Sequence, residues 1–220
     1  MVDTNIRRLG DTKDIRIRYT KGVRDHEEHK RGRQHKMARK TAATAPITND
    51  DLALARHLLA TMTNDQISES DQWYADARQL CEQWAAQSGY TLEQCAAVMA
   101  LCSINASWAG NVTLARKALL HGEIEGLPIK VKNVTAILQG APIEDHLTNG
   151  SKVRNFYRSI LLQDSCTVDR WVFRVFGKPQ GETWYPWVER AVRQLAAEYG
   201  LPAFMLQARL WVAIMAVWEA

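Results

Sequence analysis

The chain has 220 residues, of which 46% are hydrophobic and 24% charged, and its formal net charge is +4. This length is sufficient for one domain with a substantial buried core. No apolar run approaches the roughly 18 residues that span a bilayer, and the N-terminus carries no apolar signal region, so we expect neither a membrane partner nor secretion.

The positive charge is concentrated at the start of the chain. Residues 1–40 hold 13 Lys and Arg against 6 Asp and Glu, which leaves a small acidic excess in the remainder. Residues 1–46 show no sustained helical or strand period, so we expect a disordered basic arm there. Such an arm suits the phosphates of DNA, although a merely solubilising tail would have the same composition. The candidate phosphate contacts are Arg31, Arg33, Lys36, Arg39 and Lys40.

From residue 47 onward the apolar periodicity is helical, and strand signals are nearly absent. Thr91 and Gln94 form a capping box, and the helix that follows is apolar on nearly all sides, so it should be the buried central helix. We therefore predict an all-α domain over residues 47–220. Its expected helices are 51–61, 73–87, 92–103, 112–120, 131–138, 151–161, 168–176, 187–199 and 203–218.

The cysteines of the chain lie inside apolar stretches and show no paired spacing of the kind that metal sites use. They are Cys81, Cys95, Cys102 and Cys166. We expect them to be small core residues rather than disulfides or ligands. No metal and no cofactor are predicted.

The segment 147–176 carries the residues best suited to chemistry. A turn at Gly150 precedes a basic helix that carries Lys152 in its first turn, and Asp169 lies at the start of the next helix. Two helices that start close together bring an ammonium and a carboxylate to one cleft. Backbone N–H groups at the first helix start, around Ser151, can also bind a phosphate.

Two stretches resemble the endonuclease III superfamily of helix-hairpin-helix DNA glycosylases. The first pairs GSKVRN at 150–155 with VDRWVFRV at 168–175, which places Lys152 and Asp169 17 positions apart, as in that family. The second is LCSINASW at 101–108, which matches the family's buried helix, its base-replacing wedge and the next helix start. The resemblance implies a two-lobed helical bundle of the glycosylase type.

The resemblance also implies an enzyme that flips a base out of DNA and cleaves its N-glycosidic bond. Asn105 would fill the gap that the flipped base leaves in the duplex, and Trp108 or Trp171 would stack on the flipped base. Asp169 would stabilise positive charge on the sugar or deprotonate a nucleophile. Lys152 would attack C1′ and form a Schiff base, which adds lyase activity.

Further DNA contacts are expected on the same two helices and their turn. They are Gly150, Ser151, Arg154, Asn155, Arg170 and Arg174. Each candidate also has a simpler interpretation: Asp169 as a helix cap, Lys152 as a phosphate contact, Asn105 as a turn residue and the tryptophans as core.

The sequence departs from the glycosylase pattern in ways that keep different functions open. The hairpin retains one glycine, Gly150, and the C-terminal iron–sulfur cysteines of the family are missing. The chain also resembles small phage proteins, through a Trp73-Tyr74-x-x-Ala77 helix and a late LQAxxW at 206–211. Some phage relatives resemble transferases that attach an amino acid or amine to activated 5-hydroxymethyluracil in DNA.

This resemblance implies a cytoplasmic location in an infected bacterial cell. The sequence is also compatible with a non-catalytic DNA-binding protein and with a helical interaction protein that binds no nucleic acid. It leaves open the target base, excision as opposed to modification, the role of Lys152, the role of the arm and the oligomeric state.

Overall fold

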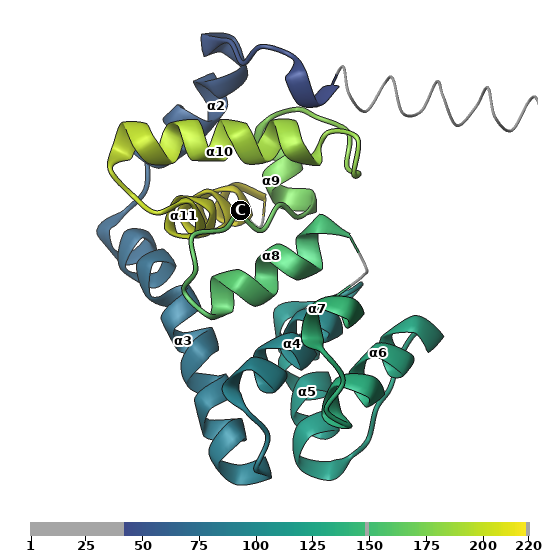
Figure 1. Cartoon of the computed structure of the whole chain (residues 1–220). Helices are drawn as coiled ribbons and strands as arrows, with labels where there is room; N and C mark the ends of the chain where they lie inside the picture. The colour runs from purple at the N-terminus through teal and green to yellow at the C-terminus, as the bar shows by residue number, and fades with distance from the viewer. Residues whose placement is uncertain (1–41, 148–149, 219–220) are drawn as a thin grey trace, which may run out of the picture. The chain divides into compact units, whose positions relative to one another are not determined.

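The computed structural model describes residues 42–147 and 150–218, and the basic residues predicted to contact DNA between Arg31 and Lys40 lie outside this part. Within the described residues all regular elements are helical, which confirms the all-α prediction (Figure 1). The elements in chain order are α2 (Asn49–Ala60), α3 (Asn64–Ser88), α4 (Leu92–Cys102), α5 (Trp108–Arg116), the π-helical turn η1 (Lys117–His121), α6 (Pro128–Leu138), α7 (Ile143–His146), α8 (Ser151–Ile160), α9 (Arg170–Val175), α10 (Tyr185–Tyr199) and α11 (Ala203–Trp218).

Capping boxes start three of these helices. At α4 the Gln94 backbone N–H donates to Thr91 Oγ1 at 3.1 Å, and the Thr91 N–H donates to Gln94 Oε1 at 2.9 Å, which confirms the predicted box. At α3 the same arrangement joins Thr63 and Gln66, so the helix begins at Asn64 rather than at residue 73. Residues 64–72 are mostly polar, and this is why apolar periodicity alone missed the first part of α3.

Helix α4 forms the centre of the first of two hydrophobic clusters. All eight residues from Cys95 to Cys102 are buried, and α4 packs against α3, α5, α6 and α8. This confirms the prediction of a central buried helix. The four cysteines are buried and free, as expected for small core residues.

The second hydrophobic cluster is built by α2, α9, α10 and α11, with Trp187, Leu206 and Leu210 among its fully buried side chains. In Figure 1, α10 and α11 lie next to each other, while α4, α5 and α6 gather in the other part of the helical body. The long helix α3 packs along α11 and links the two clusters. These two helices are joined by a bidentate ion pair in which Arg209 donates to both carboxylate oxygens of Asp71 at 2.7 Å.

The residues just before α2 are packed against α10. Ala42 is buried, the carbonyl of Ala45 accepts from Arg190 Nη2 at 2.8 Å, and the carbonyl of Pro46 accepts from Trp187 Nε1 at 3.4 Å. The packed body therefore includes residues 42–46, which the sequence placed in the arm. The reason is tertiary: their carbonyls find donors on a helix far along the chain.

No single helix within residues 42–147 and 150–218 is long and apolar enough to cross a membrane. Helices α10 and α11 reach that length and composition only together, and the chain bends by 101° between them.

Candidate active site

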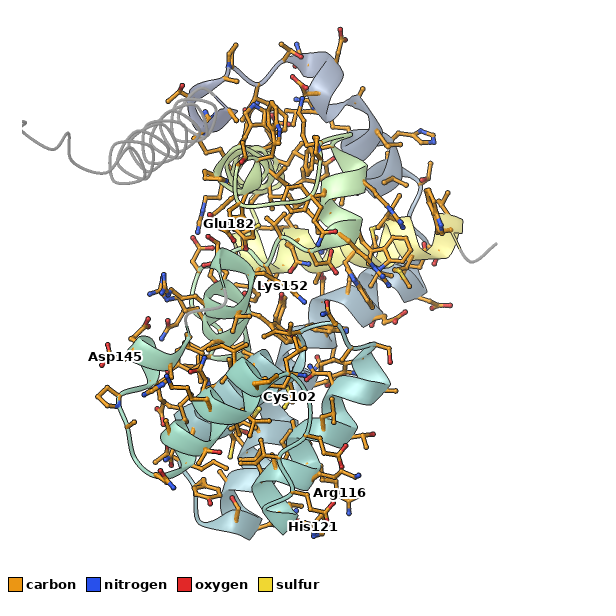
Figure 2. The ribbon with its side chains drawn as sticks, turned by 90° about the vertical axis from the view of Figure 1, so that its right-hand side faces the viewer. Cys102, Arg116, His121, Asp145, Lys152 and Glu182 are labelled. Carbon is orange, nitrogen blue, oxygen red and sulfur yellow. The ribbon has the colours of Figure 1, made fainter. Side chains whose placement is uncertain are left out.

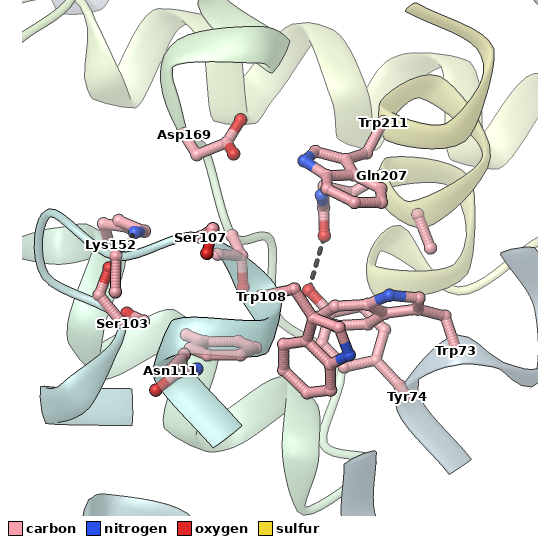
Figure 3. A pocket seen from close by; sticks show the side chains of 14 residues that line it. Trp73, Tyr74, Ser103, Ser107, Trp108, Asn111, Lys152, Asp169, Gln207 and Trp211 are labelled. Carbon is pink, nitrogen blue, oxygen red and sulfur yellow. Dashed lines mark hydrogen bonds between the residues drawn. The ribbon is translucent and has the colours of Figure 1, made fainter. Parts of the chain in front are cut away.

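A pocket lies where α3, α5, α8 and α11 meet, and its cavity volume is about 100 Å³ (Figure 3). This space holds several water molecules or part of a small ligand. The lining residues come from five stretches of the chain. They are Trp73, Tyr74, Ser103, Ala106, Ser107, Trp108, Asn111, Lys152, Phe156, Thr167, Asp169, Gln207, Ala208 and Trp211.

Aromatic rings form one wall of the pocket. The Trp73 ring centroid lies 4.8 Å from Trp108, 5.9 Å from Trp211 and 6.0 Å from Phe156. Rings at these separations pack as tilted or offset pairs and offer flat π-faces. Such a wall suits a planar ligand, because every heterocyclic base has a π-face that can stack on it.

A buried hydrogen bond joins the two helices behind this wall. Tyr74 Oη donates to Gln207 Oε1 at 2.5 Å, and both side chains are buried. Burial raises the pKa of Tyr74 well above its ordinary value, so the phenol stays protonated and can donate. The motifs Trp73-Tyr74-x-x-Ala77 on α3 and LQAxxW on α11 therefore meet at this site.

Asp169 is the N-cap of α9, and it also lines the pocket. Its Oδ1 accepts from the backbone N–H groups of Trp171 at 2.9 Å and Val172 at 3.1 Å. Burial is the largest influence on this carboxyl and raises its pKa, against the lowering effect of the Val172 N–H and of the Lys152 charge. The capping interpretation is confirmed, and the cap leaves Oδ2 without either backbone donor. A carboxylate with a raised pKa is a better proton acceptor.

Lys152 projects from the first turn of α8 into the same pocket. Its Nζ donates to the carbonyl of Ser103 at 3.3 Å, so it spans from α8 to the end of α4. Burial lowers the pKa of Lys152, and the nearby Arg170 charge lowers it further, while Asp169 opposes the shift. In Figure 3, Lys152 and Asp169 lie on one side of the pocket, with Trp73 and Trp211 on the other.

The helix start that was predicted to bind a phosphate is occupied by a carboxylate of the protein itself. Glu182, which is labelled in Figure 2, accepts from the Ser151 backbone N–H through Oε1 at 3.0 Å and from Ser151 Oγ through Oε2 at 2.9 Å. Gly150 has φ 89° and ψ 176°, a conformation available essentially to glycine, and a Cβ there would lie 2.6 Å from Glu182 Oε1. Gly150 and Ser151 thus cradle Glu182, and a phosphate can bind only if Glu182 moves.

Two predicted DNA contacts have structural partners instead. Asn155 Nδ2 donates to the carbonyl of Cys166 at 2.9 Å and to Tyr185 Oη at 3.1 Å, so this amide faces inward. Trp171 does not line the pocket. It packs against the second hydrophobic cluster, and its ring centroid lies 5.9 Å from that of Trp218. The sequence placed both on the correct helices, but helix rotation in the tertiary fold sets which way they point.

The remaining predicted contacts are not part of the pocket lining. Arg170 and Arg174 are exposed, and their guanidinium groups stand 5.1 and 4.3 Å from the centre of the Trp171 ring. Arg154 lies 3.6 Å from a Glu144 carboxylate oxygen. Asn105 is exposed in the turn between α4 and α5 with φ 56°, in the left-handed region that few non-glycine residues adopt. Contact of these residues with DNA stays a prediction.

A family model matches residues 39–217, which is most of the chain and includes every residue of the pocket. This protein belongs to the family of unknown function DUF7178. No curated protein and no solved structure matches the chain. The match shows the family of the chain, and because the function of that family is unknown, it assigns no activity to the pocket.

The sequence missed several pocket residues of this DUF7178 protein. Trp73 and Trp211 were visible only as parts of two short motifs, far apart in the chain, and helical spacing favoured a core role for Trp211. Asn111 was visible only as the asparagine that opens the next helix in the glycosylase-like stretch, without a role of its own. Trp73 fits the apolar face that Ala77 and Leu80 continue, so its spacing predicts a core residue, and only the fold brings it into one pocket with Asn111.

Proposed function

We propose that this protein is an enzyme that acts on a base flipped out of DNA and cleaves its N-glycosidic bond, with Asp169 and Lys152 at the reacting sugar. The observation that carries the proposal is that these two side chains line one pocket with a wall of aromatic rings. The spacing of Lys152 and Asp169, which resembles that of the endonuclease III superfamily, supports it independently.

In the proposed reaction the base lies against the Trp73 and Trp108 rings. The Lys152 amine attacks C1′ while the C1′–N bond breaks, and the base leaves with the bonding electron pair and takes up a proton. The Asp169 carboxylate stabilises the positive charge that develops on the sugar and accepts the proton that the lysine nitrogen loses. The lowered pKa of Lys152 increases the fraction of neutral amine that can attack. The sugar ring then opens to a Schiff base, which permits strand cleavage by elimination.

DNA contact is proposed to come from the surface around the pocket. The left-handed turn at Asn105 holds a polar side chain outward, as a wedge in the emptied stack requires. Arg154, Arg170 and Arg174 would neutralise phosphates, together with the basic arm. At the hairpin, Glu182 would have to release Ser151 before a phosphate could take its place.

The same pocket supports a second candidate, a transferase that attaches an amine to an activated 5-hydroxymethyl group of uracil in DNA. The observation that favours it is the raised pKa of Asp169, which suits deprotonation of an incoming amine. This reaction would need Lys152 as a cation that neutralises a departing phosphate. We rank base excision first because the spacing of Lys152 and Asp169 resembles that of the endonuclease III superfamily.

Duplexes that carry uracil, 5-hydroxymethyluracil or oxidised bases test both candidates. Abasic sites and borohydride-trapped covalent complexes are expected from excision, whereas a mass increase of the base after addition of an amine donor indicates transfer. The decisive variant is Asp169→Asn, because asparagine also caps helices and keeps α9 intact. We expect its rate to fall about 10²–10⁴-fold.

Matched controls separate the chemistry from general effects of charge. Asp145→Asn removes an exposed carboxylate on α7 (Figure 2), and Lys132→Gln, which removes an exposed ammonium on α6, pairs with Lys152→Gln. Both controls should keep the parent rate. An Asp169→Asn protein as active as the parent would disprove the catalytic assignment, and salt-dependent DNA binding without any product would indicate a non-catalytic binding protein.

A further inference from the structure

Asn111 stands out among the polar groups of the pocket because its acceptor has no partner. The residue is 2% exposed, and its Oδ1 is buried without a hydrogen bond within the described part of the chain. Buried polar atoms are almost always paired, so an orphaned amide oxygen on a residue that lines a cavity calls for an explanation. A ligand that supplies the missing donor provides one.

The other polar side chains around the cavity are engaged within the protein. Ser103 Oγ donates to the Ala100 carbonyl at 2.7 Å, and Ser107 Oγ accepts from the Gly110 N–H at 3.2 Å. Thr167 Oγ1 lies 3.3 Å from Ser159 Oγ. The Tyr74–Gln207 bond, the Lys152 bond to Ser103 and the Asp169 cap complete the set. Among these side chains, Asn111 is the one with a buried acceptor, Oδ1, that the described part of the chain leaves without a partner.

The position of Asn111 is fixed by its helix. It lies in the first turn of α5, where its backbone N–H donates to the Ser107 carbonyl at 2.8 Å. Trp108, on the same turn, belongs to the aromatic wall, so one turn contributes both an aromatic and an amide residue to the lining of the cavity. An amide offers one acceptor and one donor side by side, which is the pattern that pairs with the edge of a nucleobase.

We propose that Asn111 is the specificity-determining residue of this pocket, and that it pairs with a planar heterocycle carrying an N–H donor beside an acceptor on one edge. The ring would stack on the wall formed by Trp73 and Trp108, while the Asn111 amide accepts from the N–H and donates to the neighbouring acceptor. This inference rests on the proposed function for the claim that the heterocycle is a DNA base, but the ligand site itself does not depend on catalysis.

Free methylated bases provide the test, because they need neither DNA binding nor turnover. 1-Methyluracil and 1-methylcytosine keep a donor beside an acceptor, whereas 1,3-dimethyluracil lacks the N–H. Tryptophan fluorescence of the full chain, titrated to millimolar concentrations, reports binding at the aromatic wall. We expect at least one of the first two bases to bind about tenfold or more tightly than 1,3-dimethyluracil, and Asn111→Leu to abolish this preference.

Thermal unfolding of the variants distinguishes a ligand-binding role of Asn111 from a structural role. Because its acceptor is orphaned, replacement of Asn111 by leucine should leave the thermal midpoint unchanged or raise it. Asn133 is the matched control: it is a buried asparagine on α6 that does have a partner, His146 Nδ1 at 3.5 Å, so Asn133→Leu should lower the midpoint. A clear loss of stability in Asn111→Leu would mean a structural role and would overturn the inference.

The outcomes also separate this inference from the proposed function. Equal binding of 1,3-dimethyluracil, or binding of none of the bases, would overturn the role of Asn111 and leave the cavity to water. Excision of a base from DNA with a substrate preference unchanged by Asn111→Leu would uphold the proposed function while refuting the inference. Base binding that depends on Asn111, with no reaction on any duplex, would support the inference and refute the proposed function.

Discussion

The hydroxyl of Tyr185 holds together the segment that leads into Asp169. It accepts from the Val168 backbone N–H at 3.0 Å and from Asn155 Nδ2 at 3.1 Å, and it donates to the Cys166 carbonyl at 2.8 Å. Tyr185 is 3% exposed, so water cannot replace these bonds. Burial raises its pKa well above the ordinary value, and the phenol is therefore protonated and a donor at neutral pH.

Tyr185→Phe removes this hydroxyl and little else. The Cys166 carbonyl and the Asn155 amide keep each other as partners, but the Val168 N–H is left buried with none of its former bonds. The bonds to Asn155 and Cys166 contribute about 1 kcal/mol each, and the orphaned buried Val168 N–H costs about 1–3 kcal/mol, so we expect a loss of about 3–5 kcal/mol in the free energy of unfolding. The loss should appear in urea titration as a lower midpoint with an unchanged slope.

Tyr157→Phe is the matched control for this measurement. Tyr157 is 8% exposed, and its hydroxyl makes no hydrogen bond to another residue of the described chain, so the same substitution should change stability by less than about 0.5 kcal/mol. If Tyr185→Phe were no less stable than Tyr157→Phe, the bonding around Val168 would not be what positions the Asp169 segment, and that part of the reasoning would be refuted.

Two further predictions concern carboxylates outside the pocket. Hydrogen bonding to Lys178, at 2.8 Å, and then to the Thr48 backbone lowers the pKa of Asp51 from 3.8 to about 2, so its contribution to stability is present above about pH 4 and is lost as the pH falls toward about 2. The stability difference between the parent and Asp51→Asn should therefore shrink in that window, and a difference independent of pH would contradict the ion pair. Glu182→Ala should lower stability by about 1–2 kcal/mol by uncapping α8, yet strengthen binding to a DNA duplex in fluorescence anisotropy at low salt, because Ser151 becomes free for a phosphate. Weaker DNA binding by Glu182→Ala would argue against any phosphate at the hairpin.

The helix start at Gly150 and Ser151 was predicted from local sequence, but its partner Glu182 was not. The turn at Gly150 does present N–H groups at a helix start, as the sequence indicated. The chain supplies its own anion for that position from the segment between α9 and α10. No spacing rule connects residue 182 with residue 151, because the contact depends on how the loop before α10 returns across α8.

The helical class, most helix positions and the central role of α4 could be predicted from the sequence, because apolar periodicity and capping residues act within a few residues of each other. The sequence also placed Lys152 and Asp169 at the starts of two successive helices, and both starts are where the pattern put them. These features depend on local backbone chemistry, which any stretch of sequence carries with it.

Which side chains face the pocket depends on the packing of the whole fold. This packing turned Asn155 and Trp171 away, joined Tyr74 to Gln207 across the chain, and left the Asn111 acceptor buried beside Trp108. Each of these outcomes requires a particular rotation and crossing of helices that are distant in sequence. The two hydrophobic clusters set that rotation, and a helix start or a motif spacing carries no information about it.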